Sequence, residues 1–253
     1  MRHWEGLGYY SRARNLKKTA IKIIKDYNGR LPSSAEELKE LPGIGEYTSK
    51  AIMAIAFNKK IIPLDGNVER ILKRVFYLRK DEEISKEYLN SKINFFGTSN
   101  RASDYAQAIM EIGALVCKPN NPLCEKCPIS QNCISYKKND FVLKTKNKLN
   151  KTKYFEAKIY QNNNTYLLVK NSKFNFLKNM PIFPMSEVKE KKFKYSNSKK
   201  INIKLSNMDM KIILNKINKL PNIKDKILFS RTHTKSIILP SFTKKIFSSI
   251  SKI

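Results

Sequence analysis

The stretch LPGIGEYTSKAI, residues 41–52, decides the fold of the first part of the chain. Pro42 stops a preceding helical pattern, and Gly43 and Gly45 allow a tight turn. Helical periodicity then resumes and continues to residue 57. The pattern predicts two helices joined by a glycine hairpin, whose backbone N–H groups can approach a phosphate. An ordinary helix turn is the more frequent explanation of such a stretch taken alone.

Helical patterns continue on both sides of the hairpin. Ser34, followed three residues later by Glu37, forms a predicted capping box for the short helix that stops at Pro42. The other helical patterns cover residues 9–27, 67–78, 84–95 and 101–115. Residues 1–140 are therefore expected to form an all-α domain.

Composition and charge divide the chain. Residues 1–140 carry 24 basic and 16 acidic side chains, residues 141–253 carry 26 and 5, and all eight glycines lie between Gly6 and Gly113. A boundary near residue 140 is therefore expected. The net charge of +29 favours a nucleic-acid partner. Because lysine, asparagine and isoleucine are abundant throughout, a compositionally biased genome explains the charge equally well.

The second part of the chain has the pattern of a small α+β domain. A basic linker is predicted at residues 141–152 and the domain at residues 153–253. The helix candidate covers residues 209–219. The strand candidates are YFEAKIYQ (154–161), TYLLVKN (165–171), KILFS (226–230) and SIILPSF (236–242).

The sequence favours the cytoplasm and no membrane partner. No apolar run approaches the roughly 20 residues that span a bilayer, and the first residues, MRHWEG, lack the apolar core of a signal peptide. All four cysteines lie between Cys117 and Cys133. In a reducing compartment such clustering favours a metal or cluster site over disulfides.

The cysteine spacing, Cys117-x6-Cys124-x2-Cys127-x5-Cys133, suits such a site. Four thiolates from one short loop can bind either a 4Fe-4S cluster or one tetrahedral zinc ion. A purely structural role for the thiols is the least favoured explanation, because the chain has no other cysteine.

A single aspartate stands between the hairpin and the cysteines. Asp65 lies in IIPLDGNVER, residues 61–70, after an apolar run and before a predicted helix. Its simplest role is an N-cap. A carboxylate at this point can also face a substrate cleft, and the residues alone leave both roles open.

The order of these three elements resembles the helix-hairpin-helix superfamily of DNA glycosylases. More closely, the chain resembles the MutY family of adenine DNA glycosylases over about residues 4–135. The matching segments are GLGYYSRARNL (6–16), LPGIGEYTSKAI (41–52), PLDGNVERIL (63–72) and the four cysteines. The resemblance implies excision of adenine mispaired with 8-oxoguanine or guanine, by hydrolysis of the N-glycosidic bond in double-stranded DNA. It also implies a 4Fe-4S cluster, bound by Cys117, Cys124, Cys127 and Cys133. A monomer is expected.

Endonuclease III shares the hairpin and the cluster but is a bifunctional glycosylase and lyase. That family carries a nucleophilic lysine second after the last hairpin glycine, where this chain has Tyr47. Without an amine no Schiff base is expected at this position. Tyr47 matches a position at which some MutY-like enzymes carry a tyrosine close to the reacting sugar.

The resemblance assigns roles to further residues. Adenine excision leaves positive charge on the sugar, and Asp65 matches the carboxylate that stabilises it, with Asn67 to orient that carboxylate. Tyr9 matches the family's intercalating tyrosine, and its alternative role is a core aromatic. Gly43 and Gly45 match the hairpin that binds a DNA phosphate.

The C-terminal domain resembles the Nudix-like domain by which MutY enzymes sense 8-oxoguanine. Phe229-Ser230-Arg231 matches a Phe-Ser-His loop that contacts the oxidised guanine, with Arg231 in place of histidine. The segment lacks the glycine and the glutamates of a working Nudix box. Recognition is therefore expected of this domain, and pyrophosphate hydrolysis is not.

The family's general acid is a glutamate in a helix that precedes the segment matched by residues 6–16. This chain starts at Met1, and that helix is expected to be missing from it. A catalytically impaired DNA-binding remnant is therefore one alternative function. A redox-active iron–sulfur protein that binds DNA is another.

Overall fold

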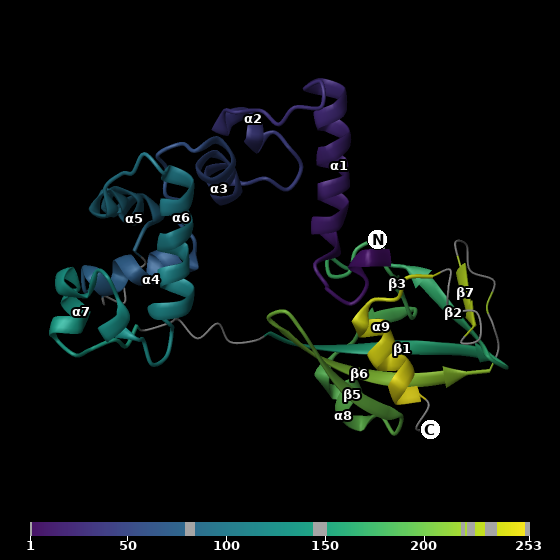
Figure 1. Cartoon of the computed structure of the whole chain (residues 1–253). Helices are drawn as coiled ribbons and strands as arrows, with labels where there is room; N and C mark the ends of the chain where they lie inside the picture. The colour runs from purple at the N-terminus through teal and green to yellow at the C-terminus, as the bar shows by residue number, and fades with distance from the viewer. Residues whose placement is uncertain are drawn as a thin grey trace. The chain divides into compact units, whose positions relative to one another are not determined.

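The computed structural model describes residues 2–78, 84–143, 151–218, 221, 226–230 and 237–250 (Figure 1). They form two compact units, one of residues 15–146 and one that combines residues 1–14 with residues 147–253. The domain limits expected from the sequence stay a prediction, and most of the predicted basic linker lies outside the described residues. No described helix has both the length and the apolar character that crossing a bilayer requires.

The unit of residues 15–146, here the helical unit, contains helices joined by loops (Figure 1). The pattern predicted at 101–115 ends in a π-helix, Ile112–Val116, and the one at 84–95 ends in a 3-10 helix, Ile93–Phe96. Each predicted helix of this unit is confirmed. The α-helices are α1 (Tyr10–Asp26), whose residues before Asn15 belong to the other unit, α2 (Ala35–Lys39), α3 (Glu46–Phe57), α4 (Gly66–Val75), α5 (Lys86–Lys92), α6 (Ala102–Glu111) and α7 (Ile134–Lys137).

Local sequence explains where these helices begin and end. The Ser34 hydroxyl accepts a hydrogen bond from the Glu37 N–H at 3.2 Å, which confirms the serine half of the predicted capping box, and it donates one to the Glu37 carboxylate at 2.7 Å. Asn58 ends α3 in the left-handed conformation. Asp65 is the N-cap of α4.

Helix α4 lies at the centre of the core of this unit. Val68, Ile71, Leu72 and Val75 recur at helical spacing and are almost fully buried. Burial of each such side chain contributes about 1.5–3 kcal/mol. The buried stripe fixes the rotation of α4 about its axis, so the polar residues at its N-terminus and along its other faces have defined positions.

The second unit, here the β-rich unit, is built on a seven-stranded sheet with the order β3-β2-β1-β6-β5, in which β4 pairs with β1 and β7 with β2 (Figure 1). Its elements are η1 (Arg2–Trp4), β1 (Lys151–Asn162), β2 (Thr165–Lys170), β3 (Pro181–Ile182), β4 (Met185–Glu187), α8 (Glu190–Tyr195), β5 (Lys199–Leu205), β6 (Met208–Ile217), β7 (Lys226–Ser230) and α9 (Ser241–Ile250).

The core of the β-rich unit lies between the sheet and α9. Phe242 and Ile246 of α9 pack with Phe155 of β1 and Ile212 of β6 in one apolar cluster. The strands predicted at 154–161, 165–171 and 226–230 are confirmed as parts of β1, β2 and β7.

The helix predicted at residues 209–219 is wrong, because this segment forms the strand β6. Ile212, Ile213 and Leu214 are all buried, since the strand is covered on both faces. A strand of this kind has a continuous apolar run, which periodicity cannot distinguish from a buried helix. Its parallel pairing with β1 along its whole length is a long-range contact that the local sequence does not reveal.

The strand predicted at residues 236–242 is also wrong within the described residues. Residues 237–240 form no strand, and Ser241 and Phe242 begin α9. Pro240 suits the start of a helix because its missing N–H is not needed there, and its carbonyl accepts a hydrogen bond from the Lys244 N–H at 3.1 Å. The apolar residues that suggested a strand continue into the buried face of α9.

Candidate functional site

The Asp65 carboxylate is held at the N-terminus of α4 by three hydrogen bonds. One oxygen accepts from the Asn67 N–H at 2.9 Å and from the Val68 N–H at 2.7 Å, and the other accepts from the Asn67 side-chain amide at 3.1 Å. Asp65 is half-buried. The N-cap role left open by the sequence is therefore present, and the same contacts fix the direction of the carboxylate.

A chain of contacts continues from Asn67 along α4 to the cysteine loop. The Arg70 guanidinium donates to the Asn67 side-chain oxygen at 2.8 Å, to the Gly113 carbonyl at 2.5 Å and to the Cys117 carbonyl at 2.7 Å. Gly113 lies in the π-helix, and a Cβ on it would stand 2.6 Å from the Asn67 Cβ. Only glycine therefore lets the π-helix approach α4 this closely.

Tyr47, in the first turn of α3, is 41% exposed. Partial burial raises the pKa of its hydroxyl, and the negative charge of Asp65 raises the pKa further. The phenol and the carboxylate therefore interact electrostatically. Of the three residues to which the sequence assigned the chemistry, Asp65 and Asn67 are joined by hydrogen bonds, and Tyr47 is near enough for the Asp65 charge to act on its hydroxyl.

The two hairpin glycines differ in their surroundings. Gly43 has φ +85°, and a Cβ on it would stand 2.8 Å from Asn15 of α1, so this position requires glycine. Gly45 has φ −104° as the N-cap of α3, and a Cβ there would meet open space. As the N-cap of α3, Gly45 has no side chain to cap the first turn, and the amides of that turn are suited to bind an anion.

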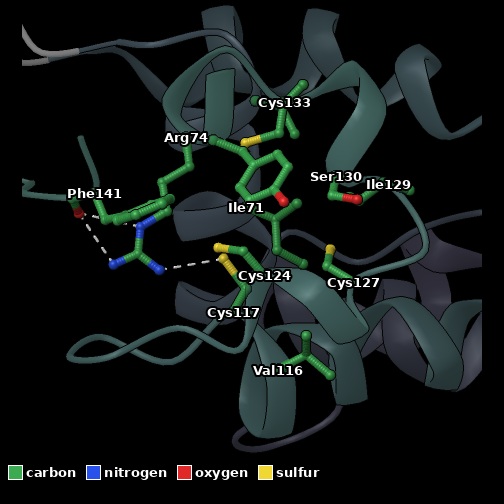
Figure 2. A pocket seen from close by; sticks show the side chains of 12 residues that line it. Ile71, Arg74, Val116, Cys117, Cys124, Cys127, Ile129, Ser130, Cys133 and Phe141 are labelled. Carbon is green, nitrogen blue, oxygen red and sulfur yellow. Dashed lines mark hydrogen bonds between the residues drawn. The ribbon is translucent and has the colours of Figure 1, made fainter. Parts of the chain in front are cut away.

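The four cysteines line one pocket at the C-terminal half of α4. Figure 2 shows their side chains with Arg74 and Ile71 of α4 and with Phe141. Arg74 is 2% exposed and donates to the Cys117 sulfur at 3.3 Å.

The thiols of this pocket are partly buried. Burial is the largest cause that raises the pKa of Cys124, Cys127 and Cys133, and the neighbouring cysteines raise it further. The positive charge of Arg74 acts in the opposite direction on Cys124 and Cys133. No group of three or more histidine, cysteine or acidic side chains within the described ranges is arranged around one common metal ion.

The β-rich unit contains the other predicted DNA-contacting residues. Tyr9 is 69% exposed and has φ +44°, an uncommon backbone conformation for a non-glycine residue, whereas the next residue, Tyr10, is 4% exposed. Tyr9 is thus a surface side chain and does not have the core role that was its alternative.

The predicted recognition residues lie at the end of β7. Phe229 is 4% exposed and its ring lies 5.1 Å from that of Phe247, so it belongs to the core. Ser230 is half-buried and pairs with Thr165 of β2. Arg231 lies outside the described residues. Phe229 is therefore a core residue of the β-rich unit, and its ring is not available at the surface.

Sequence reasoning missed Arg70, Arg74 and Gly113. The two arginines stand four residues apart and so share one face of α4, but periodicity assigns a charged residue to the surface. Gly113 interrupts a helical pattern, which is a signal for a close packing contact. All three become interpretable only when α4, the π-helix and the cysteine loop are placed together.

Comparison with known proteins identifies several relatives. Residues 1–95 match the HhH-GPD superfamily of base excision DNA repair proteins. The chain is 34% identical to the adenine DNA glycosylase of Buchnera aphidicola subsp. Baizongia pistaciae over an alignment of 273 positions. This alignment covers 98% of this chain and 77% of that protein. It is 37% identical over 208 residues to the adenine DNA glycosylase of Buchnera aphidicola subsp. Schizaphis graminum, covering 79% of this chain and 59% of that protein.

Among solved structures, a non-covalent complex of endonuclease III with DNA is similar over 52% of this chain and 60% of that protein. The sequence identity is 30% and the TM-score is 0.43. The relation of this chain to known proteins therefore rests on the sequence relatives.

Proposed function

Because this chain belongs to the adenine DNA glycosylase family of base excision repair hydrolases, we propose that it removes adenine mispaired with 8-oxoguanine or guanine in duplex DNA. The observation that carries the proposal is the Asp65 carboxylate, held by two backbone N–H groups and by Asn67. Breaking the N-glycosidic bond leaves positive charge on the deoxyribose. A fixed carboxylate stabilises that charge without having to reorganise as it develops.

Other residues are assigned to binding and positioning. Asn67 orients the carboxylate. Tyr47 is proposed to stand beside the sugar, where it would offer a phenol and no amine. The first-turn amides of α3 at Gly45 bind a DNA phosphate. Tyr9 fills the gap that the flipped adenine leaves in the stack. The general acid that protonates adenine is assigned to no residue.

Asp65→Asn tests this assignment in single-turnover excision from an 8-oxoguanine:adenine duplex. Loss of the charge is expected to lower the rate by about 10²–10³. The matched control is Glu69→Gln, which removes another α4 carboxylate that pairs with Lys73 and lies 38% exposed. The assay is run on this chain and on any upstream in-frame extension of it. Excision that is insensitive to Asp65→Asn contradicts the proposal, and duplex binding without excision in either protein favours the DNA-binding remnant.

The donor set supports a 4Fe-4S cluster held by Cys117, Cys124, Cys127 and Cys133. Four thiols line one pocket, and in such a cluster each thiolate binds a different iron, so no common ion centre is needed. When bound, the cluster ties the loop together and supplies a redox couple. Anaerobically purified protein is expected to be brown, with about four irons per chain. Colourless protein with stoichiometric zinc contradicts this assignment.

The β-rich unit is proposed to be Nudix-like and to read the base opposite adenine through Ser230. Ser230 is the last residue of β7 and follows the buried Phe229. Ser230→Ala is expected to reduce the ratio of affinities for 8-oxoguanine:adenine and guanine:adenine duplexes by about tenfold, because a hydrogen bond to one of them is lost. An unchanged ratio removes Ser230 from the site. We further propose a monomer that acts in the cytoplasm.

A further inference from the structure

Arg74 makes an unusual set of contacts for a buried cation. Its guanidinium donates to the Lys118 carbonyl at 2.7 Å, to the Pro119 carbonyl at 2.8 Å and to the Phe141 carbonyl at 3.1 and 3.2 Å. It also donates to the Cys117 sulfur at 3.3 Å, and Figure 2 shows it between that sulfur and Phe141. Arg74 therefore uses its planar fork of donors in several directions at once.

The acceptors come from the start of the cysteine loop and from the segment that follows it. Lys118 and Pro119 directly follow the first cysteine, whereas Phe141 follows the last cysteine and α7. One side chain on α4 thus ties the beginning of the loop to the segment after its end. These contacts hold the two parts of the chain together beside the pocket that the four thiols line.

The contact with sulfur has a second consequence. A guanidinium is charged throughout the physiological pH range. A cluster bound by four thiolates is an anion, and reduction makes it more negative. A cation that donates an N–H to one of its sulfurs therefore stabilises the reduced form more than the oxidised form, and so raises the reduction potential.

We propose that Arg74 is a positioning residue of the cluster site, which holds the cysteine loop closed around the cluster and raises the reduction potential of the bound cluster through the Cys117 sulfur. The inference rests on the proposed 4Fe-4S cofactor. A merely structural arginine would affect unfolding but would leave the potential unchanged.

The test compares Arg74→Met and Arg74→Lys with Lys73→Met in the full chain. Lys73 is the neighbouring cation on α4, pairs with Glu69 and has a 27% exposed side chain. Lys73→Met therefore removes a nearby charge without touching the loop. The readouts are the rate at which a chelator removes iron from the reconstituted protein, and the reduction potential by protein-film voltammetry.

Removing the Arg74 contacts is expected to speed cluster loss by about 10- to 100-fold, as for other groups that hold metal ligands in place. The potential should fall in Arg74→Met and by less in Arg74→Lys, which keeps the charge but loses the fork. Lys73→Met should match the wild type in both. Should Arg74→Met fail to fold, Arg74→Lys decides: faster cluster loss supports the inference, and wild-type values in both readouts overturn it.

The two proposals fail in different ways. A wild-type protein that takes up zinc and no iron overturns the cofactor and the Arg74 inference together. A brown wild type, with the two Arg74 variants equal to Lys73→Met in cluster loss and potential, overturns the role of Arg74 alone.

Discussion

The helical unit and the β-rich unit hold their candidate residues in different ways. Asp65 is held by directed hydrogen bonds from α4, and Arg70 connects its partner Asn67 to the cysteine loop. Ser230 instead ends a strand whose preceding residue, Phe229, is fixed by apolar packing. A substitution at the Asp65 site should therefore remove individual hydrogen bonds. A substitution beside Ser230 should instead change the packing of the whole apolar core.

The largest expected effect tests the packing side of this contrast. Phe229→Ala removes a ring that is 4% exposed and should lower the free energy of unfolding of the β-rich unit by about 3–5 kcal/mol. The matched control is Leu228→Ala on the same strand, because Leu228 is 50% exposed. Urea unfolding measures both. Equal losses would show that β7 is not held by the burial of Phe229.

The next effect tests the directed contacts of the helical unit. Gly113→Ala places a methyl group 2.6 Å from the Asn67 Cβ and 3.0 Å from its backbone carbon, so Asn67 must move. A catalytic group that is misplaced by about 1 Å can lower the rate by about 10²-fold. Single-turnover excision should fall accordingly, with the cluster still bound. Gly97→Ala is a comparison for strain alone, because Gly97 has φ +67° and no atom near its Cβ position.

The same contrast explains what the sequence could predict. Helices of the first unit follow from caps and from periodicity within a few residues, such as Ser34 with Glu37 and the stripe of Val68 and Ile71. The strand β6 was mistaken for a helix because its identity depends on β1, about fifty residues away in the sequence. The site shows the same limit. Asp65 and the cysteines stand in recognisable motifs, whereas Arg70 and Arg74 gain meaning only from acceptors far along the chain.

A smaller effect separates the two hairpin glycines. Gly45→Val should weaken binding to duplexes of any sequence by about tenfold, because a side chain at the open N-terminus of α3 hinders amide contacts with a phosphate. Stability should change little, since the Gly45 Cβ position is open. Gly43→Ala is the counterpart, with φ +85° and a Cβ 2.8 Å from Asn15, and it should lower stability instead. Unchanged affinity in folded Gly45→Val protein makes the hairpin purely structural.

The smallest effect concerns the electrostatic contact between Tyr47 and Asp65. Burial raises the pKa of the Tyr47 hydroxyl, and the Asp65 charge adds to that rise. A phenol loses a proton to become an anion, so a neighbouring negative charge opposes its ionisation. In Asp65→Asn the pKa of Tyr47 should therefore fall, while staying above the ordinary value because the burial remains.

The shift can be followed by NMR titration of ring-labelled tyrosine, with Tyr47→Phe to identify the signal. Glu46→Gln is the matched control, because the Glu46 carboxylate is next to Tyr47 in the sequence but pairs with Lys50 and Lys39. It should leave the Tyr47 pKa in place. If Asp65→Asn also leaves it in place, the phenol and the carboxylate do not share a site. The proposed position of Tyr47 beside the sugar would then be wrong, whereas the hydrogen bonds that hold Asp65 would be unaffected by this result.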